Sequence, residues 1–240
     1  ARQARRHRPP AMHNGSVTDF TIPGPAGALR ATVYEAADAR HTLILAHGAG
    51  AGQGHPWMRA RAGDLATRGT RVITFDFPYM FSGRKVPDRT PVLLDAWRAV
   101  VAGVAARFPA ELLAIGGKSM GGRMATMVLA EGDAPRAVRG CVALGYPLHP
   151  PGKPDQLRVA HLSAVRVPLL VVQGTRDPFG GPDEIRQAFA AAGARPEVVE
   201  VPHGGHGFEV RVRDAKQADV YARVADTLSR WLDTLPATPD

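Results

Sequence analysis

Cysteine is nearly absent from this chain of 240 residues, in which Cys141 is the only example. A single cysteine excludes an intrachain disulfide, and a chain without disulfides is typical of a reducing compartment. Cys141 lies within the apolar run GCVALG, where a free thiol behaves as a small buried hydrophobe. We therefore predict a cytoplasmic protein that is stabilised by its hydrophobic core.

Long apolar runs are also absent. No window reaches the roughly 20 apolar residues that a membrane-spanning helix needs. The arginine pair near the start is not followed by the apolar stretch that a secretion signal requires. We therefore expect no membrane partner for this chain.

Acidic residues are in the minority, with 22 aspartates and glutamates against 30 lysines and arginines, for a formal net charge of +8. Arginines within residues 1–16 supply half of this excess, but the segment contains no aromatic side chain on which a base could stack. We therefore expect no nucleic-acid partner. The pattern predicts a basic, disordered extension at 1–16, a single domain at 17–235 and a short tail at 236–240.

What the sequence does contain is a regular alternation of short apolar runs with helical patterns. The expected strands lie at 17–22, 29–35, 42–48, 71–77, 112–117, 141–145, 168–174 and 196–202. The expected helices lie at 58–68, 91–107, 120–131, 182–192 and 214–235. The first two strands alternate polar and apolar residues, which predicts an antiparallel pair at one edge of the sheet.

Most of the later strands are nearly continuous apolar runs, which is typical of strands covered on both faces. Strands that alternate with helices favour a parallel sheet. We therefore predict an α/β fold with a mostly parallel, doubly wound sheet, helices on both faces and no separate lid domain. The longest irregular stretch, at 146–168, has room for one short helix.

The segment LLAIGGKSMGGR, at 112–123, contains a sequence that resembles the end of a phosphate-binding loop. Gly117, Lys118 and Ser119 match the last positions of G-x-x-x-x-G-K-[ST]. The first glycine of that motif would fall at Leu112, inside an apolar strand that leaves no loop to wrap around a phosphate. We therefore exclude nucleotide binding by this motif.

The same residues spell G-x-S-x-G, a turn that presents a nucleophilic serine between a strand and a helix. An apolar strand leads into Ser119, and a helical pattern begins at Met120. Gly117 and Gly121 allow strand and helix to approach closely, and the helix N-terminus favours developing negative charge. We therefore predict that Ser119 is the nucleophile of a hydrolase, with Lys118 at a position that the motif leaves free.

A serine nucleophile needs a histidine base and an acid that orients the histidine, in the chain order Ser, acid, His. Asp177 follows a buried strand at the carboxyl edge of the sheet, where the sites of α/β folds gather. Its alternative role is to cap the turn before Pro178. His203 and His206 both lie in the loop VPHGGHGFEV, and we predict His206 as the base and His203 as its neighbour.

Two backbone amides are needed to stabilise the oxyanion of an acyl transfer. One is expected from Met120, which follows the nucleophile, and the other from Ala49 in the loop AHGAGAG, with Gly50 as the second choice. Substrate contacts are expected from His47, Gly48, Gly50, Tyr79, Met80 and His149. His47 has bracing of this loop as its alternative role. No metal ion or organic cofactor is required.

The stretches AHGAGAG, FDFPYM, GGKSMGGR, LGYPLHPPGKP, VQGTRDPFG and GGHGF resemble the α/β-hydrolase superfamily. Within it, the chain is similar to small lid-less hydrolases of the dienelactone-hydrolase-like group. It resembles most the branch that includes a testis-expressed protein and a subunit of the chromatin-associated NSL complex. The resemblance covers about 42–208 and implies a triad of Ser119, Asp177 and His206.

These features together predict a serine hydrolase that cleaves an ester, thioester or related acyl bond of a small substrate through an acyl-enzyme. The alternative is a catalytically silent protein that uses the hydrolase fold as a scaffold, since a fold alone does not imply turnover. We expect a monomer or a small homo-oligomer. Arg84, Lys85 and Arg89 are candidates for selecting an anionic acyl group, with a solvated basic loop as the alternative.

Overall fold

The computed structural model describes residues 15–25, 27–109, 112–132, 134–135, 137–211 and 216–236. Most of the extension predicted at 1–16 and of the tail predicted at 236–240 lies outside these ranges. So do the residues at 214–215 with which the last helix was expected to begin.

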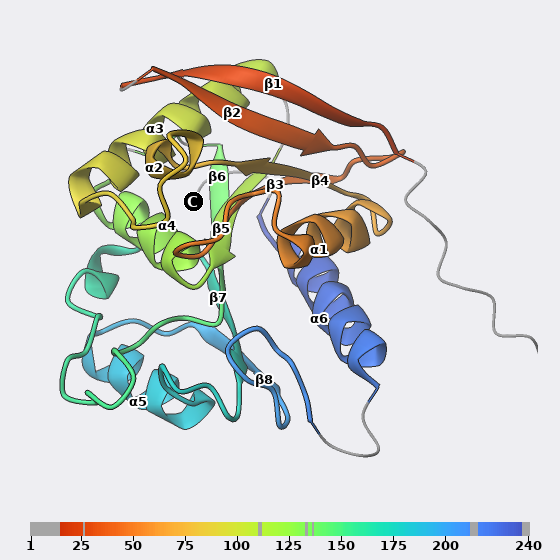
Figure 1. Cartoon of the computed structure of the whole chain (residues 1–240). Coiled ribbons are helices and arrows are strands. Elements are labelled where there is room, and N and C mark those ends of the chain that lie inside the picture. Colours follow the sequence, from red (N-terminus) through yellow and green to blue (C-terminus); the bar gives the residue numbers. More distant parts are fainter. Residues whose placement is uncertain are drawn as a thin grey trace, which may run out of the picture.

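One sheet of eight strands forms the centre of the molecule (Figure 1). The strands are β1 (Val17–Gly24), β2 (Gly27–Tyr34), β3 (His41–Ala46), β4 (Thr70–Phe75), β5 (Leu113–Lys118), β6 (Val138–Leu144), β7 (Leu169–Gly174) and β8 (Glu197–Val201). They are arranged in the order β1-β2-β4-β3-β5-β6-β7-β8. The pairs β1–β2 and β2–β4 are antiparallel, and the remaining pairs are parallel. The predicted antiparallel edge and the mostly parallel sheet are confirmed.

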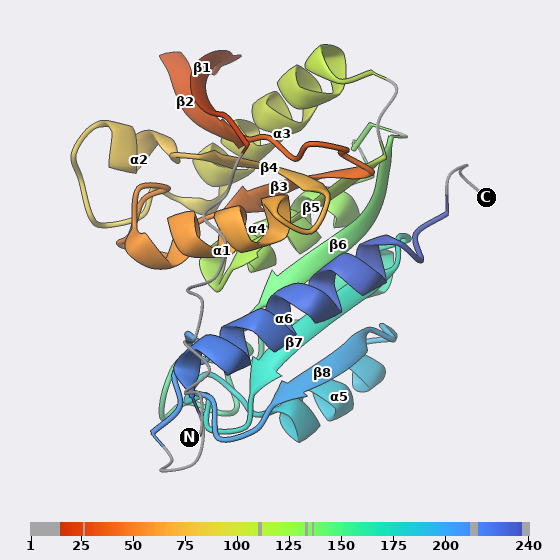
Figure 2. The same cartoon turned by 90° about the vertical axis from the view of Figure 1, so that its right-hand side faces the viewer.

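Helices cover both faces of the sheet, as predicted. Helices α1 (Pro56–Ala66) and α6 (Gln217–Leu232) lie on one face, in front of the sheet in Figure 2. Helices α3 (Thr90–Arg107), α4 (Met120–Ala130) and α5 (Pro182–Ala191) lie on the other. Successive side chains of a strand point to opposite faces of the sheet, and nearly all of those in the central strands are buried. Each face of the sheet therefore has its own hydrophobic core.

Two short helices complete the described fold. Helix α2 (Pro78–Phe81) was not expected, and it follows β4 in the segment FPYM. The 3₁₀ helix η1 (Leu162–Ala164) is the one short helix for which the irregular stretch at 146–168 had room, and it packs against α4. No separate lid domain interrupts the described residues.

The topology brings the candidate site together at one edge of the sheet. Five consecutive strands of the sheet, β3, β5, β6, β7 and β8, all run in parallel. Their carboxyl ends therefore lie at the same edge of the sheet. The glycine loop follows β3 and the turn at Ser119 follows β5. The predicted acid Asp177 follows β7, and the predicted base His206 follows β8. In open α/β sheets this edge is where ligands bind.

Candidate active site

The turn at Ser119 has the strained backbone that exposes a nucleophile. Ser119 has φ 50° and ψ −116°, a conformation that L-residues seldom adopt. Its backbone N–H donates to the Leu144 carbonyl at 2.9 Å, which ties the turn to β6. A Cβ at Gly117 or at Gly121 would lie 2.6 Å from the Ala46 carbonyl oxygen, so only glycine lets α4 begin this close to β3.

Ser119, His206 and Asp177 form a continuous hydrogen-bonded chain. The Ser119 hydroxyl lies 2.8 Å from His206 Nε2, and His206 Nδ1 lies 2.8 Å from Asp177 Oδ2. The Asp177 side chain is fully buried, whereas that of His206 is 22% exposed. If Nδ1–H donates to the carboxylate, Nε2 is left free to accept the serine proton. The three groups are thus placed for base-assisted attack by a serine hydroxyl.

Asp177 makes the contacts that each of its two suggested roles requires. Its Oδ1 accepts from the Phe179 backbone N–H at 2.9 Å, which caps the turn after Pro178. Its Oδ2 accepts from His206 and from the side-chain amide of Gln173 at 3.0 Å. The bonds from Phe179 and Gln173 hold the carboxylate beside the imidazole of His206.

Gln173 is a residue of the site that the sequence argument did not single out. Its amide nitrogen donates to Asp177 and to the Gly180 carbonyl, and its amide oxygen accepts from the Tyr146 backbone N–H at 2.8 Å. It therefore joins the turn after β6 to the turn after β7. One feature of the sequence could have indicated a role for Gln173. It is a polar residue at the end of the apolar run LLVVQ, four positions before the predicted acid.

The loop that carries His206 is held from two sides. Lys118 Nζ donates to the His206 carbonyl at 2.6 Å, and Trp57 Nε1 donates to the Gly207 carbonyl at 3.0 Å. The Lys118 ammonium also lies 5.8 Å from the centre of the Trp57 ring. Burial lowers the pKa of Lys118 to about 8, although Asp177 and Glu209 oppose this shift.

His203 is not part of the hydrogen-bonded chain. It is exposed, and its backbone N–H donates to the Thr175 hydroxyl at 2.7 Å. Its φ of 59° shows that it belongs to a tight turn after β8. Three residues later, His206 lies against the Phe179 ring with ring centroids 4.3 Å apart. The geometry therefore favours His206 over His203 as the base.

The glycine loop after β3 lies beside the serine. A Cβ at Gly48 would lie 3.6 Å from the Ser119 Cβ. The loop is anchored through Gln53, whose backbone N–H donates to Asp76 Oδ1 at 2.8 Å and whose side-chain oxygen accepts from Thr74 at 2.9 Å. Asp76 therefore holds this loop in place.

His47 braces the loop from inside the protein. Its Nε2 accepts from the Phe77 backbone N–H at 3.1 Å, which leaves Nδ1–H to donate to the Gly48 carbonyl at 2.8 Å. Burial lowers the pKa of His47, so the ring stays neutral and both nitrogens are used. Tyr79 acts similarly, because its hydroxyl accepts from the Gly50 backbone N–H at 3.3 Å.

These contacts correct three of the expected substrate contacts. His47 and Tyr79 have no exposed surface, and His149 is only 6% exposed with Nδ1 bonded to the Pro150 carbonyl. Burial of these three side chains argues against direct contact with a substrate, and the bonds of His47 and Tyr79 show that they support the glycine loop. Met80 is partly exposed, and its Cε lies against the glycine loop, 3.1 Å from where a Cβ of Gly52 would lie. Gly48 is buried beside Ser119, and Gly50 is exposed.

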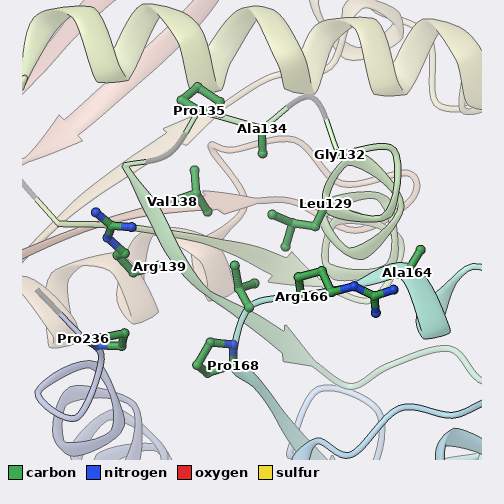
Figure 3. Close-up of a pocket in the computed structure, with 11 residues that line it drawn as sticks. Leu129, Gly132, Ala134, Pro135, Val138, Arg139, Ala164, Arg166, Pro168 and Pro236 are labelled. Atoms are coloured by element: carbon green, nitrogen blue, oxygen red, sulfur yellow. The ribbon is translucent and has the colours of Figure 1, made fainter. Parts of the chain in front are cut away.

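A cavity of about 340 Å³ lies at the opposite end of β6 and β7 (Figure 3). It is lined largely by apolar side chains, including Leu129, Val138 and Pro168, with Arg139 and Arg166 also contributing. Val138 begins β6 and Pro168 directly precedes β7, so the cavity lies at the amino ends of these strands and is remote from the serine turn. Among the described residues, no group of three or more histidines, cysteines, aspartates or glutamates is placed to hold a metal ion.

The fold and the arrangement of these loops define an α/β hydrolase. Residues 39–233 match the family described as an alpha/beta hydrolase domain, and the chain belongs to this family. It is therefore a hydrolase. In the part of the chain that the structure describes, no helix has the length and apolar character needed to cross a membrane.

Solved structures with the same fold include an α/β serine hydrolase without a lid from Xanthomonas campestris. It is 24% identical, with a TM-score of 0.70 over 95% of this chain and 100% of that chain. A dienelactone hydrolase from Anabaena variabilis is 19% identical, with a TM-score of 0.72 over 93% of this chain and 99% of that chain. At these identities the likeness establishes the fold.

Proposed function

We propose that this chain is a serine hydrolase that cleaves an ester, thioester or related acyl bond of a small substrate. The observation that carries the proposal is the hydrogen-bonded chain from the Ser119 hydroxyl through His206 to the buried Asp177, with both distances at 2.8 Å. Nucleophile and base within hydrogen-bond reach, with the base oriented by an acid, is the arrangement that activates a serine.

In the proposed reaction, Ser119 Oγ attacks the acyl carbon while its proton passes to His206 Nε2. Asp177 holds the imidazole in the required tautomer and stabilises the imidazolium. Collapse of the tetrahedral intermediate expels the alcohol or thiol, which takes the proton from His206. Water then attacks the acyl-enzyme with the same base, which releases the acid and restores Ser119.

The proposed oxyanion hole consists of the Met120 and Ala49 backbone amides. Met120 is the first residue of α4, where a helical N–H has no partner within the helix. Gly50, the second choice for the other donor, already donates to Tyr79. Ala49 is exposed in the loop beside Ser119, which supports it as the second donor.

Intact-mass spectrometry after treatment with a fluorophosphonate tests this proposal, since such reagents phosphonylate activated serines. We expect one adduct on the wild type and none on Ser119→Ala or His206→Ala. His203→Ala is the matched control, because this exposed histidine lies on the same loop, and it should keep the adduct.

Absence of an adduct on folded wild type would contradict the proposal and favour the alternative, a hydrolase fold used as a scaffold. Turnover by Ser119→Ala at the wild-type rate would do so equally. The cytoplasmic location, the monomer or small homo-oligomer and the domain boundaries at 17 and 235 remain predictions.

A further inference from the structure

Among the described residues, no carboxylate forms an ion pair with the Arg123 guanidinium. Its Nε is buried and has no hydrogen-bond partner. Burial lowers the pKa of Arg123. Tyr146 opposes this shift, whereas the neighbouring positive charge of Arg158 adds to it. Burial raises the pKa of Tyr146, so its phenol is neutral at physiological pH. Burying a guanidinium without a partner is unfavourable, which points to an anion that arrives from outside.

Arg123 lies on α4 one helical turn after the proposed nucleophile. The partly exposed residues of α4 are Met120, Arg123, Met127 and Ala130, whose spacing puts them on one face of the helix. That face begins at the serine turn, and the Arg123 backbone N–H donates to the Ser119 carbonyl at 3.1 Å. The Cα–Cβ bonds of a helix tilt toward its N-terminus, so the Arg123 side chain starts in the direction of the serine turn.

The neighbours of Arg123 also belong to the edge of the sheet that holds the triad. Tyr146 directly follows Gly145, where a Cβ would lie 3.3 Å from His206 Nδ1. The Tyr146 hydroxyl donates to the Arg158 carbonyl at 2.6 Å, which holds the Arg158 backbone beside Tyr146. The Arg158 guanidinium donates to the Pro147 carbonyl at 3.3 Å.

The basic loop at 79–89 is a weaker candidate for the same task. Arg84, the first of its three cations, already forms an ion pair with Asp88 at 2.7 Å. Arg84 is also more than half exposed, so water screens its charge. By contrast, Arg123 is partly buried and Arg158 adds a second positive charge, which strengthens attraction for an anion.

We infer that Arg123, assisted by Arg158, binds a carboxylate that the acyl substrate carries at the end remote from the scissile bond. The inference rests on the proposed function and narrows its substrate class to monoesters and monothioesters of dicarboxylic acids. The planar guanidinium can donate two parallel hydrogen bonds to a carboxylate, which a neutral ester cannot accept with equal strength. Hydrolysis itself follows the acyl-enzyme route described above.

The test compares 4-nitrophenyl hemiadipate with 4-nitrophenyl hexanoate, which differ by a carboxylate in place of a terminal methyl. Hemiglutarate and hemisuberate esters, each with its neutral analogue, extend the comparison to other chain lengths. For the wild type we expect a higher kcat/KM for at least one anionic ester. Arg123→Gln should lower that value about ten- to a hundredfold, the range for a charge-assisted hydrogen bond, while the neutral ester is unaffected.

Two further variants sharpen the comparison. Arg158→Gln should cause a smaller loss of the same kind. Arg195→Gln is the matched control, because Arg195 is exposed and precedes β8 at the opposite edge of the sheet. It should leave both esters unchanged. Thermal denaturation of each variant identifies any loss of activity that is caused by unfolding.

A binding measurement keeps the inference testable without turnover. Calorimetry on Ser119→Ala should detect binding of monomethyl adipate but not of dimethyl adipate, and adding Arg123→Gln should abolish the binding signal.

No preference for any anionic ester in an active wild type would overturn the inference while leaving the proposed hydrolase activity intact. Equal losses for anionic and neutral esters in Arg123→Gln would overturn it too. A wild type that binds monomethyl adipate but takes no fluorophosphonate would instead contradict the proposed function alone.

Discussion

Lys118 donates a hydrogen bond of 2.6 Å to the backbone carbonyl of His206, a residue 88 positions away in the chain. The bond joins the residue before the proposed nucleophile to the proposed base. Because Lys118 precedes Ser119 on the rigid strand β5, it can hold the histidine loop in register with the serine. We therefore expect Lys118 to act as a positioning residue, through its effect on the proposed base His206.

Replacing Lys118 with methionine tests this positioning role. We expect Lys118→Met to lower kcat about ten- to a hundredfold with little change in KM, because the lost bond to a charged donor orients the base without touching substrate. Steady-state kinetics and the rate of fluorophosphonate labelling measure the effect. Lys216→Met, at an exposed lysine before α6, is the control. A change confined to KM would contradict the role.

Replacing Asp177 with asparagine should remove most of the turnover and leave the fold intact. An asparagine at this position favours the wrong imidazole tautomer, a change that lowers kcat about 10⁴-fold in a known serine-protease triad. Burst and steady-state kinetics on an activated ester measure the loss. The control is Asp183→Asn, whose side chain is 98% exposed. Activity of Asp177→Asn near that of the control would refute the assignment.

Two helical glycines are expected to respond in opposite ways to alanine. In Gly121→Ala the new Cβ would lie 2.6 Å from the Ala46 carbonyl oxygen and 2.7 Å from that of His47, so α4 must shift and both stability and activity should fall. In Gly63→Ala, within α1, the Cβ meets no atom within 4 Å. There we expect a gain of about 0.5–1 kcal/mol in the free energy of unfolding, with unchanged activity. Urea denaturation distinguishes the two outcomes.

His161 should make the protein less stable in acid. Burial, with a smaller contribution from Arg123, lowers its pKa from the ordinary 6.5 to about 4. Between these values the unfolded chain binds a proton that the folded chain does not, so the free energy of unfolding decreases as pH falls from 6.5 to 4. Urea denaturation across this range should show a smaller decrease for His161→Gln. An identical pH dependence in both proteins would contradict this explanation.

The effect of Arg123 on the pKa of His161 offers a second test that Arg123 is charged and lies near this histidine. Because the Arg123 charge contributes to the low pKa of His161, Arg123→Gln should raise that pKa. NMR titration of the His161 ring measures this directly and does not depend on any substrate. Titration of His161 at the same pH in both proteins would show that Arg123 does not lie beside it.

Most of the fold was predictable from the sequence because its signals are local. Apolar runs of strand length alternating with helical periods gave the order of elements, and β5, Ser119 and α4 form a continuous strand–turn–helix unit. Even the oxyanion candidate Met120 follows from its place next to the serine. Such features depend on neighbouring residues, whose backbone preferences and hydrophobic pattern are visible without knowledge of the rest of the chain.

The sequence by itself therefore determined the α/β architecture and the position of Ser119, and it narrowed the acid and base to a few residues. Only the tertiary structure decided that His206 rather than His203 reaches the serine, and that His47, Tyr79 and His149 are buried supports. The bond from Lys118 to the histidine loop also emerged only there, as did the buried Nε of Arg123, which has no hydrogen-bond partner among the described residues. Burial and long-range contacts arise when distant segments meet, and no local pattern encodes which side chains then face one another or water.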